Sequence, residues 1–284
     1  MVGKQLADEV AAALGSAVRS SRPVSGGDIN RAEEMALADG RVVFVKSNPG
    51  ADPAMFTAEA RGLAWLAQAQ ALRVPQVLAV AEKFLVLEHI SPGSRRADFS
   101  ERLGRGLAAL HRFGAPSFGL DHDNFIGRLP QSNAPVATWP DFYRERRLEP
   151  QLRMARAAGL CSPAMARDFD RLFAVLAERV GAPEPPARLH GDLWGGNLIV
   201  DETGAACLID PAVYGGHREI DLAMMRLFGG FAPAVFAAYQ EAWPLSPGHE
   251  ERVALYQLYF LMVHVNLFGG SYVAQAEHAL REAI

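Results

Sequence analysis

The chain has 284 residues, of which 50% are apolar, so it can bury a large core and form two lobes around a cleft. Its 28 Lys and Arg against 32 Asp and Glu give a net charge of −4 without a basic block, which excludes nucleic acid as an expected partner. The two cysteines, Cys161 and Cys207, match neither a disulfide framework nor a zinc site.

Neither the first residues nor the most apolar stretch indicates export or a membrane span. Residues 1–6 are followed by Asp8 and Glu9 and not by an apolar signal core. Residues 255–268 are interrupted by polar side chains and are shorter than the roughly 20 residues that a span needs. We therefore expect a cytoplasmic protein in which residues 255–268 form a buried helix, with no membrane partner.

The first 90 residues carry mostly strand signals. Asp39-Gly40 is a strong hairpin pair between two apolar runs, and Gly15 follows a short amphipathic pattern as a helix stop. The expected elements are a helix over 6–14, strands over 30–37 and 41–46, a helix over 55–71, and strands over 74–80 and 84–90. We expect residues 1–90 to form a lobe with an antiparallel sheet and one main helix.

After Ser91-Pro92-Gly93 the pattern becomes helical. The expected elements are helices around 103–111, 139–158 and 163–180, a hairpin of strands 198–200 and 206–209, and further helices to the C-terminus. The sequence thus predicts an α+β fold with two lobes, in which residues 91–284 form a larger and mostly helical second lobe.

The segment from His190 to Asn197, followed by the hairpin and Asp210, indicates phosphoryl transfer. Asn197 and Asp210 lie equally far from the hairpin centre at Thr203-Gly204, so antiparallel pairing is expected to place their side chains together. An Mg²⁺ ion bound to a nucleotide takes only one or two protein oxygens, which this pair supplies. Asp192 is expected beside the same metal, where its carboxylate can accept a hydroxyl proton.

Two upstream residues support this interpretation. Lys46 ends the second hairpin strand and Glu59 lies on the next helix, the arrangement of a phosphate-binding lysine held by a helix glutamate. Taken separately, all these residues would be read as turn caps and exposed charges. Their order along the chain favours a kinase.

The motif His190-Gly191-Asp192, with Asn197 and Asp210 after it, resembles the catalytic loop and metal aspartate of the protein-kinase-like fold. The turn at Gly26-Gly27 lacks the spaced glycines of the usual phosphate-covering loop, so phosphate binding there is a weaker expectation. Only ten residues separate Asp210 from Asp221, which leaves no room for an activation segment. The acceptor is therefore expected to be a small molecule, or a small group on something larger.

The chain also resembles the fructosamine kinase family, which is related in fold to aminoglycoside and choline kinases. The resemblance rests on Phe44 to Asn48, Met55-Phe56 with Glu59, Asn124 to Gly127, Trp139 with Phe142-Tyr143, His190 to Asn197, Ile209 to Pro211, Gly216 to Glu219, Leu227 to Phe231 and Asn266 to Gly269. It implies ATP-dependent phosphorylation of the C3 hydroxyl of ketosamines, free or protein-bound, which leads to deglycation. It further implies Asp192 as the base, Asn197 and Asp210 as Mg²⁺ ligands, Lys46 and Glu59 at the ATP phosphates, and Glu88, His89 and Ile90 beside adenine.

The acceptor site is less defined. The resemblance suggests that Trp194 forms a wall for the sugar amine, and packing is the equal alternative. His217 and Arg218 are candidate acceptor contacts, although a salt bridge with Glu219 is the simpler interpretation. Asp221 and His190 are expected to brace the catalytic loop, and His264 is expected to be a core residue.

Two other functions stay open. A kinase for another small alcohol, such as an aminoglycoside or an amino alcohol, would need the same catalytic residues. A nucleotide-binding scaffold without activity is disfavoured, because such a protein has no need of a proton acceptor such as Asp192. The sequence does not indicate the oligomeric state.

Overall fold

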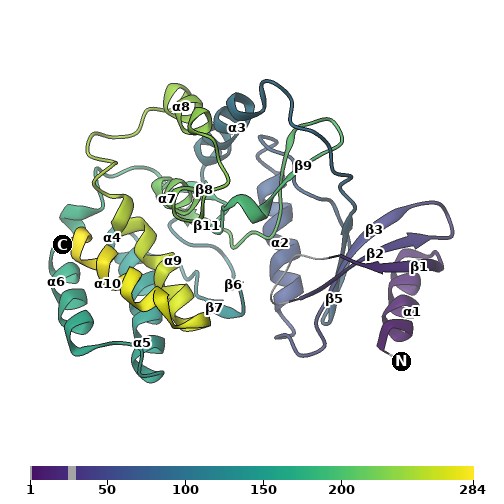
Figure 1. The fold of residues 1–284 in the computed structure, drawn as a ribbon, viewed down its shortest axis with the longest axis horizontal. Coiled ribbons are helices and arrows are strands. Elements are labelled where there is room, and N and C mark those ends of the chain that lie inside the picture. Colours follow the sequence, from purple (N-terminus) through teal and green to yellow (C-terminus); the bar gives the residue numbers. More distant parts are fainter. Residues whose placement is uncertain (1, 25–29) are drawn as a thin grey trace.

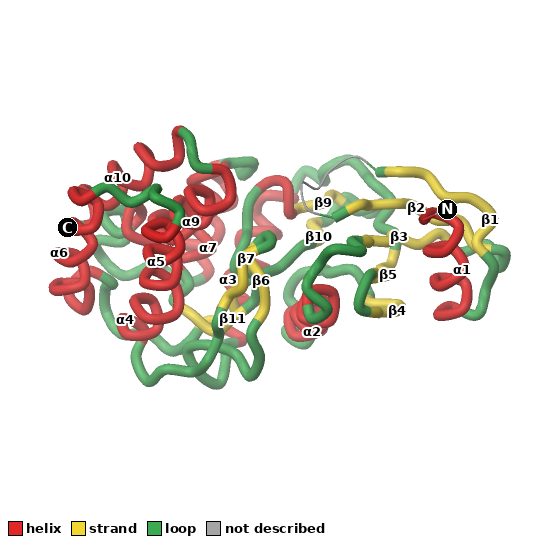
Figure 2. Tube along the Cα trace, turned by 90° about the horizontal axis from the view of Figure 1, so that it is seen from below, coloured by secondary structure: helices red, strands yellow, loops and turns green. Residues whose placement is uncertain are grey.

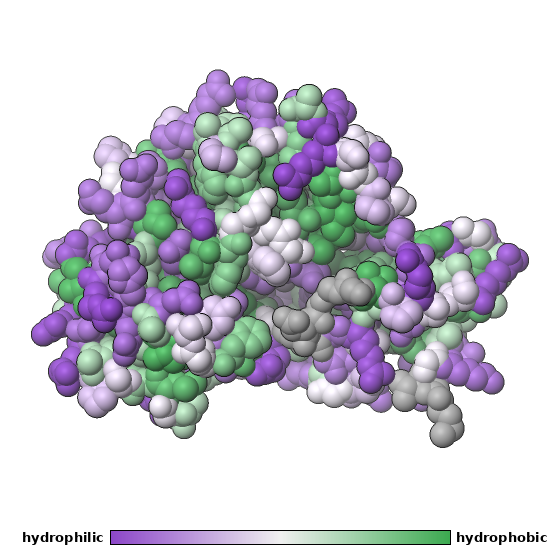
Figure 3. Space-filling view, viewed as in Figure 1, coloured by the Kyte–Doolittle hydropathy of each residue, from purple (hydrophilic) through white to green (hydrophobic). Residues whose placement is uncertain are grey.

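The computed structural model describes residues 2–24 and 30–284. Figure 1 shows a twisted sheet near the N-terminus at one end of the molecule and a larger group of helices with the C-terminus at the other. In the view of Figure 3, polar and charged residues dominate the outer margin, and apolar groups are set further in.

The N-terminal part is a five-stranded antiparallel sheet with the strand order β1-β2-β3-β5-β4. Its strands are β1 (Val18–Pro23), β2 (Arg31–Leu37), β3 (Val42–Ser47), β4 (Val77–Ala81) and β5 (Phe84–Glu88). Helix α1 (Val2–Leu14) packs Leu6 and Val10 into an apolar cluster with Met35, Val43 and Val86 of the sheet. The predicted helix, the Asp39-Gly40 hairpin and the antiparallel sheet are confirmed, while β1 was not assigned as a strand from the sequence.

Helix α2 (Met55–Ala67) connects this sheet to the rest of the molecule. On one side its Phe56 and Leu63 are buried in a cluster with Leu85 and Leu87 of β5. On the other side a Cβ added at Gly62 would lie 3.2 Å from the side chain of Val213, so α2 closely approaches the segment that follows Asp210. Figure 2 shows α2 between the sheet and the β6–β7 hairpin.

The second part is mainly helical. Its helices are α3 (Phe99–Phe113), α4 (Trp139–Phe142), a π-helix (Tyr143–Leu148), α5 (Glu149–Ala157), α6 (Pro163–Arg179), α7 (Glu219–Phe228), α8 (Pro233–Ala242), α9 (Val253–Phe268) and α10 (Ser271–Ala283). Helix α9 is buried along most of its length, with Leu258, Phe260 and Val263 in the largest core cluster, so the predicted buried helix is confirmed. Across residues 2–24 and 30–284, the search for a helix with the length and apolar character to cross a bilayer found none.

Three short two-stranded antiparallel sheets lie outside the N-terminal sheet. They are formed by β6 (Asn124–Ile126) with β7 (Leu129–Gln131), β8 (Ala187–Leu189) with β11 (Tyr214–Gly216), and β9 (Leu198–Val200) with β10 (Ala206–Leu208). The first two were not predicted, because strands of three residues are too short to show an alternating pattern.

The register of the β9–β10 hairpin differs by one position from the predicted one. Leu198 pairs with Leu208, so Asn197 lies opposite Ile209, whose backbone N–H donates to the Asn197 carbonyl at 3.1 Å. Asp210 then adopts a left-handed backbone conformation with φ +54°, which turns the chain at the end of the hairpin. The Asn197 Nδ2 atom still lies 3.4 Å from the Asp210 carbonyl oxygen, so the two residues meet by this turn and not by pairing.

Candidate active site

A cavity of about 570 Å³ lies between the sheet and the helical part. Its wall includes residues of β3, α2, β6, the segment 192–197, the segment 209–212, α7 and α9. The predicted residues Lys46, Glu59, Asp192, Trp194, Asn197 and Asp210 all line it. Segments that are far apart in the sequence therefore contribute polar groups to one space.

Lys46 connects the sheet to the end of the hairpin. Its Nζ atom lies 2.6 Å from Glu59 Oε1 and 2.5 Å from Asp210 Oδ1. The Lys46 side chain is buried in β3, and burial alone would lower its pKa, but the charges of Glu59 and Asp210 outweigh this effect and raise it. The ammonium group therefore stays charged within reach of an anionic ligand.

Asp192 and Asn197 lie beside each other in the segment before the hairpin. The Asn197 Nδ2 atom donates to the Asp192 carbonyl oxygen at 2.8 Å and approaches the Asp192 Oδ2 atom at 3.2 Å. Burial of the Asp192 carboxylate raises its pKa to about 7, and the negative charge of Asp210 contributes to this increase. A carboxylate with a raised pKa is a better proton acceptor than one on the surface.

The backbone of the catalytic loop is fixed by Asp221 on α7. The Asp221 carboxylate accepts hydrogen bonds from the backbone N–H groups of His190 at 2.8 Å and Gly191 at 2.9 Å. It also lies 3.2 Å from Nε2 of the buried His111. Gly191 has φ +83°, and a Cβ there would lie 2.1 Å from the Ala212 carbonyl oxygen, so only glycine fits. The expectation that Asp221 orients this loop is confirmed.

The oxygen atoms around Asp210 suit a hard divalent cation. With its Nδ2 atom directed at Asp192, Asn197 leaves its Oδ1 atom for a ligand, and the Asp210 side chain is 40% exposed to the cavity and solvent. The described residues contain no cluster of three or more His, Cys, Asp or Glu side chains that could hold a metal ion without help. This donor set therefore fits an ion such as Mg²⁺ that takes most of its ligands from water and phosphate.

The far wall of the cavity is aromatic. Trp194 packs edge-on against Phe228 at 6.5 Å between ring centroids, and Phe228 lies 4.5 Å from the His264 ring. The His264 ring also lies 4.9 Å from Tyr272 and 5.6 Å from Phe268. We call Trp194, Phe228, His264, Phe268 and Tyr272 the aromatic wall. His264 was expected in the core, and its place in this wall depends on the meeting of α7, α9 and α10, for which the sequence carries no local signal.

The His264 ring has a defined hydrogen-bonding state. Its Nδ1 atom lies 2.8 Å from the Phe260 carbonyl oxygen and therefore donates to it. Burial lowers the pKa of His264, which favours the neutral ring. In this tautomer Nε2 is an acceptor, so the aromatic wall includes one hydrogen-bond acceptor suited to a hydroxyl group.

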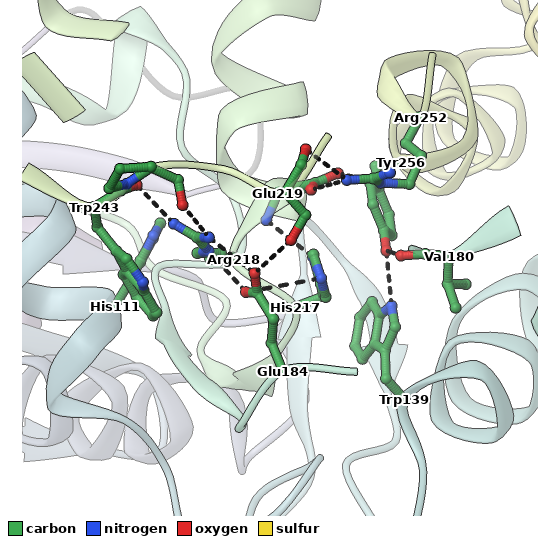
Figure 4. Close-up of polar contacts among 12 residues, drawn as sticks. His111, Trp139, Val180, Glu184, His217, Arg218, Glu219, Trp243, Arg252 and Tyr256 are labelled. Carbon is green, nitrogen blue, oxygen red and sulfur yellow. Dashed lines mark hydrogen bonds and ion pairs between the residues drawn. The ribbon is translucent and has the colours of Figure 1, made fainter. Parts of the chain in front are cut away.

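The prediction that His217 and Arg218 contact the acceptor is not supported by their positions, because neither is among the described residues that line the cavity. Both are buried, and Arg218 forms a bidentate ion pair with Glu184 at 2.7 and 2.8 Å. The His217 ring stacks on Tyr256 at 5.3 Å. The suggested salt bridge with Glu219 is also wrong, since Glu219 pairs with Arg252 at 2.6 Å (Figure 4). These residues tie α7 to the neighbouring loops.

The structure describes some, but not all, of the other residues that were predicted to bind the nucleotide. Gly26 and Gly27 lie outside the described residues. Glu88 forms an ion pair with Arg73 at 2.7 Å, and His89 lies 3.0 Å from Glu34. Ile90 is buried at the start of the connection to α3. None of these three lines the 570 Å³ cavity, so their role beside adenine stays a prediction.

Comparisons with known proteins agree with this geometry. The family model described as fructosamine kinase matches residues 2–284. A protein of Synechocystis sp. named "probable ketoamine kinase" is 40% identical over 273 residues, 94% of this chain and 91% of that protein. The chloroplastic protein-ribulosamine 3-kinase of Arabidopsis thaliana is 37% identical over 262 residues, 89% of this chain and 79% of that protein.

Solved structures show the same relationship. The crystal structure of a "putative fructosamine-3-kinase" from Thermobifida fusca has 40% sequence identity and a TM-score of 0.91, and 98% of each chain is covered. Choline kinase from Streptococcus pneumoniae, at 15% identity, matches with a TM-score of 0.64 over 99% of this chain and 98% of that chain. The predicted protein-kinase-like fold is thereby confirmed.

Proposed function

Because the chain belongs to the fructosamine kinase family, we propose that it transfers the γ-phosphoryl group of ATP to the C3 hydroxyl of a ketosamine, a sugar-modified amine. The amine is free or is part of a protein, and the phosphorylated product decomposes to release it. Residues 1–90 supply most of the nucleotide site, and residues 91–284 supply the catalytic loop and the acceptor site. The predicted location of this deglycating activity is the cytoplasm.

Lys46, Glu59, Asn197 and Asp210 form the phosphate end of the nucleotide site. Lys46 places its ammonium against the phosphates, and Glu59, 2.6 Å away, keeps it in position. Asn197 and Asp210 would hold Mg²⁺ through oxygen atoms, and the ion, when bound, neutralises negative charge on the phosphates. The 2.5 Å contact between Lys46 and Asp210 supports a phosphate site that adjoins both residues.

Asp192 is the proposed general base. Its carboxylate accepts the proton of the acceptor hydroxyl while the hydroxyl oxygen forms a bond to the γ-phosphorus and the bond from phosphorus to the ADP oxygen breaks. The hydrogen bonds from Asn197 and the bracing of the loop by Asp221 keep the carboxylate in place. Positioning of this kind supplies much of the rate in phosphoryl transfer, because it aligns the hydroxyl with the phosphorus.

The aromatic wall is the proposed acceptor site. The faces of Trp194 and Phe228 suit the apolar stem of a modified amine, and His264 Nε2 suits a sugar hydroxyl. Trp194 is 40% exposed and Phe268 is 54% exposed, so the wall continues to the mouth of the cavity. An acceptor attached to a protein lysine could therefore place its sugar inside and its backbone outside.

The observation that carries this proposal is the meeting of Lys46, Asp192, Asn197 and Asp210 in one cavity next to an aromatic wall. On the side of the aromatic wall, the described lining residues are mainly aromatic and aliphatic, whereas a polycationic aminoglycoside would favour carboxylates. The test is ATP consumption with Mg²⁺ in the presence of ribulosamine, erythrulosamine and fructosamine derivatives, compared with aminoglycosides and choline. Turnover only with the second group would refute the proposed acceptor and leave the kinase chemistry in place.

A further inference from the structure

Arg147 is a cation with no exposed surface in the interior of the helical part. It lies in the π-helix Tyr143–Leu148, whose wider turn is often found at functional positions. Across residues 2–24 and 30–284, no Asp or Glu pairs with it; its hydrogen bonds go to carbonyl and amide oxygens. Burial of an unpaired charge is unfavourable, so its presence at this position calls for an explanation.

The Arg147 guanidinium is held by a few defined contacts. Its Nη1 atom donates to the Ser132 carbonyl oxygen at 2.7 Å, and its Nη2 atom donates to Asn133 Oδ1 at 2.7 Å. Its Cζ atom lies 3.8 Å from the ring centroid of Tyr214 and 4.7 Å from that of Phe142. The Nε atom is buried and has no hydrogen-bond partner in the described part of the chain.

A chain of amide groups connects Arg147 to the cavity. Asn133 Nδ2 donates to Asn124 Oδ1 at 2.9 Å, and Gln131 Nε2 donates to the same atom at 2.7 Å. Asn124 Nδ2 then donates to the Val213 carbonyl oxygen at 2.8 Å, and Gln131 Nε2 lies 3.1 Å from the Ala212 carbonyl oxygen. Asn124 and Ala212 line the cavity, and the Ala212 N–H donates to the His190 carbonyl oxygen at 2.9 Å.

Arg147 fixes the end of this chain at Asn133. Because the guanidinium has only donors, it orients Asn133 with Oδ1 toward the arginine and Nδ2 toward Asn124. Asn124 Oδ1 accepts from both Asn133 and Gln131, which leaves Asn124 Nδ2 to donate to the Val213 carbonyl oxygen. Strand β6 and the segment after Asp210 are thereby held together at the cavity wall.

We propose that Arg147 is a positioning residue for acceptor binding, acting through Asn133 and Asn124 on the cavity wall formed by residues 124–127 and 211–212. This inference rests on the proposed function, in which residues 91–284 supply the acceptor site. Lys46 and Glu59, which are proposed to hold the phosphates, lie on β3 and α2, outside this chain of amides, so we expect the ATP KM to change less than the acceptor KM.

The test compares Arg147→Met with Arg144→Met. Arg144 is the matched control because it lies on the same π-helix and also contacts an aromatic ring, Phe173 at 4.9 Å, but its side chain is 46% exposed and pairs with Glu149. We expect Arg147→Met to raise the acceptor KM by about tenfold or more while the ATP KM changes by less than about twofold. Arg144→Met should leave both unchanged. A folded Arg147→Met protein with an unchanged acceptor KM would overturn the inference.

Asn133→Asp tests the same chain without removing the buried cation. The new carboxylate can still accept a hydrogen bond from Arg147, so the guanidinium keeps this partner. Unlike the asparagine amide, the carboxylate cannot donate a hydrogen bond to Asn124. The same rise in acceptor KM is expected at an unchanged ATP KM, and a wild-type acceptor KM would refute the proposal even if Arg147→Met fails to fold. Wild-type protein that phosphorylates no ketosamine would instead refute the proposed function; the comparison of KM values is then made with the alcohol that it does phosphorylate.

Discussion

Lys46 Nζ lies 2.5 Å from Asp210 Oδ1, although the two residues are 164 positions apart in the sequence. This contact brings the central strand β3 of the sheet against the end of the β9–β10 hairpin. Since Glu59 holds Lys46 from the opposite side at 2.6 Å, the sheet, α2 and the hairpin converge on one point of the cavity. The predictions below concern this point and the groups around it.

Replacement of Asp192 by Asn should abolish most turnover without loss of the fold. The amide keeps the size of the side chain but cannot accept the hydroxyl proton as a base, so kcat should fall by roughly 10²-fold or more. ATP affinity, measured by calorimetry, and the thermal midpoint should stay near the wild-type values. A variant with near-normal kcat would remove Asp192 from the mechanism.

Activity should require Mg²⁺ or Mn²⁺, and Asp210→Ala should abolish it. The alanine removes the carboxylate proposed to bind the metal and leaves Lys46 with Glu59 as its only carboxylate partner in the described part of the chain. The measurement is ADP release with and without excess chelator. Full turnover in chelator, or in Asp210→Ala, would contradict the proposed metal site.

Trp194→Ala should raise the acceptor KM far more than the ATP KM. The indole is 40% exposed and contacts Phe228 at one edge, so its loss removes acceptor surface without opening the core. Phe113→Ala, which removes a 54% exposed ring outside the cavity, is the control and should change neither constant. Equal rises in both KM values for Trp194→Ala would indicate a structural role only.

His217 should contribute a loss of stability as the pH falls from 7 to 4.5, whereas Asp192, whose pKa is raised to about 7, contributes in the opposite direction. Burial lowers the pKa of His217 from 6.5 to about 4. The charge of Glu184 opposes this decrease, and Arg218, Arg252 and His111 add to it. In this window the unfolded chain binds the proton and the folded chain does not, so the free energy of unfolding decreases by about 2 kcal/mol from this residue.

His217→Phe isolates this contribution. The phenyl ring can keep the stacking on Tyr256 but does not titrate, so between pH 7 and 4.5 the free energy of unfolding of the variant should rise relative to that of the wild type by about 2 kcal/mol. Urea unfolding at several pH values measures the difference. Parallel curves for the two proteins would show that His217 is not the group responsible.

The sequence predicted residues that meet in the cavity because they lie in short, recognisable segments. Asp192 and Asn197 are five residues apart, and Lys46 and Glu59 lie on consecutive elements, so local pattern was enough to propose them as one site. The structure brings these residues together in one cavity. The α+β fold was predictable for the same reason, since strand and helix signals are separated along the chain.

Other features depended on contacts that a local pattern does not encode. The partner of Arg218 is Glu184, which lies 34 positions earlier in an irregular segment, so the adjacent Glu219 was the natural but wrong choice. The predicted hairpin register was wrong by one residue because the hairpin was centred on the pair Thr203-Gly204, whereas Asp201 bonds to Ala205 across a loop of three residues, 202–204. Arg147 and His264 acquire their surroundings only through the packing of distant helices.

The central claim is tested most directly by phosphorus NMR of the products formed from ATP, Mg²⁺ and a small ketosamine such as a ribulosamine, with the sugar position of the phosphate assigned by coupling. The account predicts a single phosphomonoester on the C3 hydroxyl, followed by release of the free amine, and formation of this signal that is roughly 10²-fold slower or more with Asp192→Asn. Phosphate at another position, or on choline or an aminoglycoside and not on any ketosamine, would contradict it.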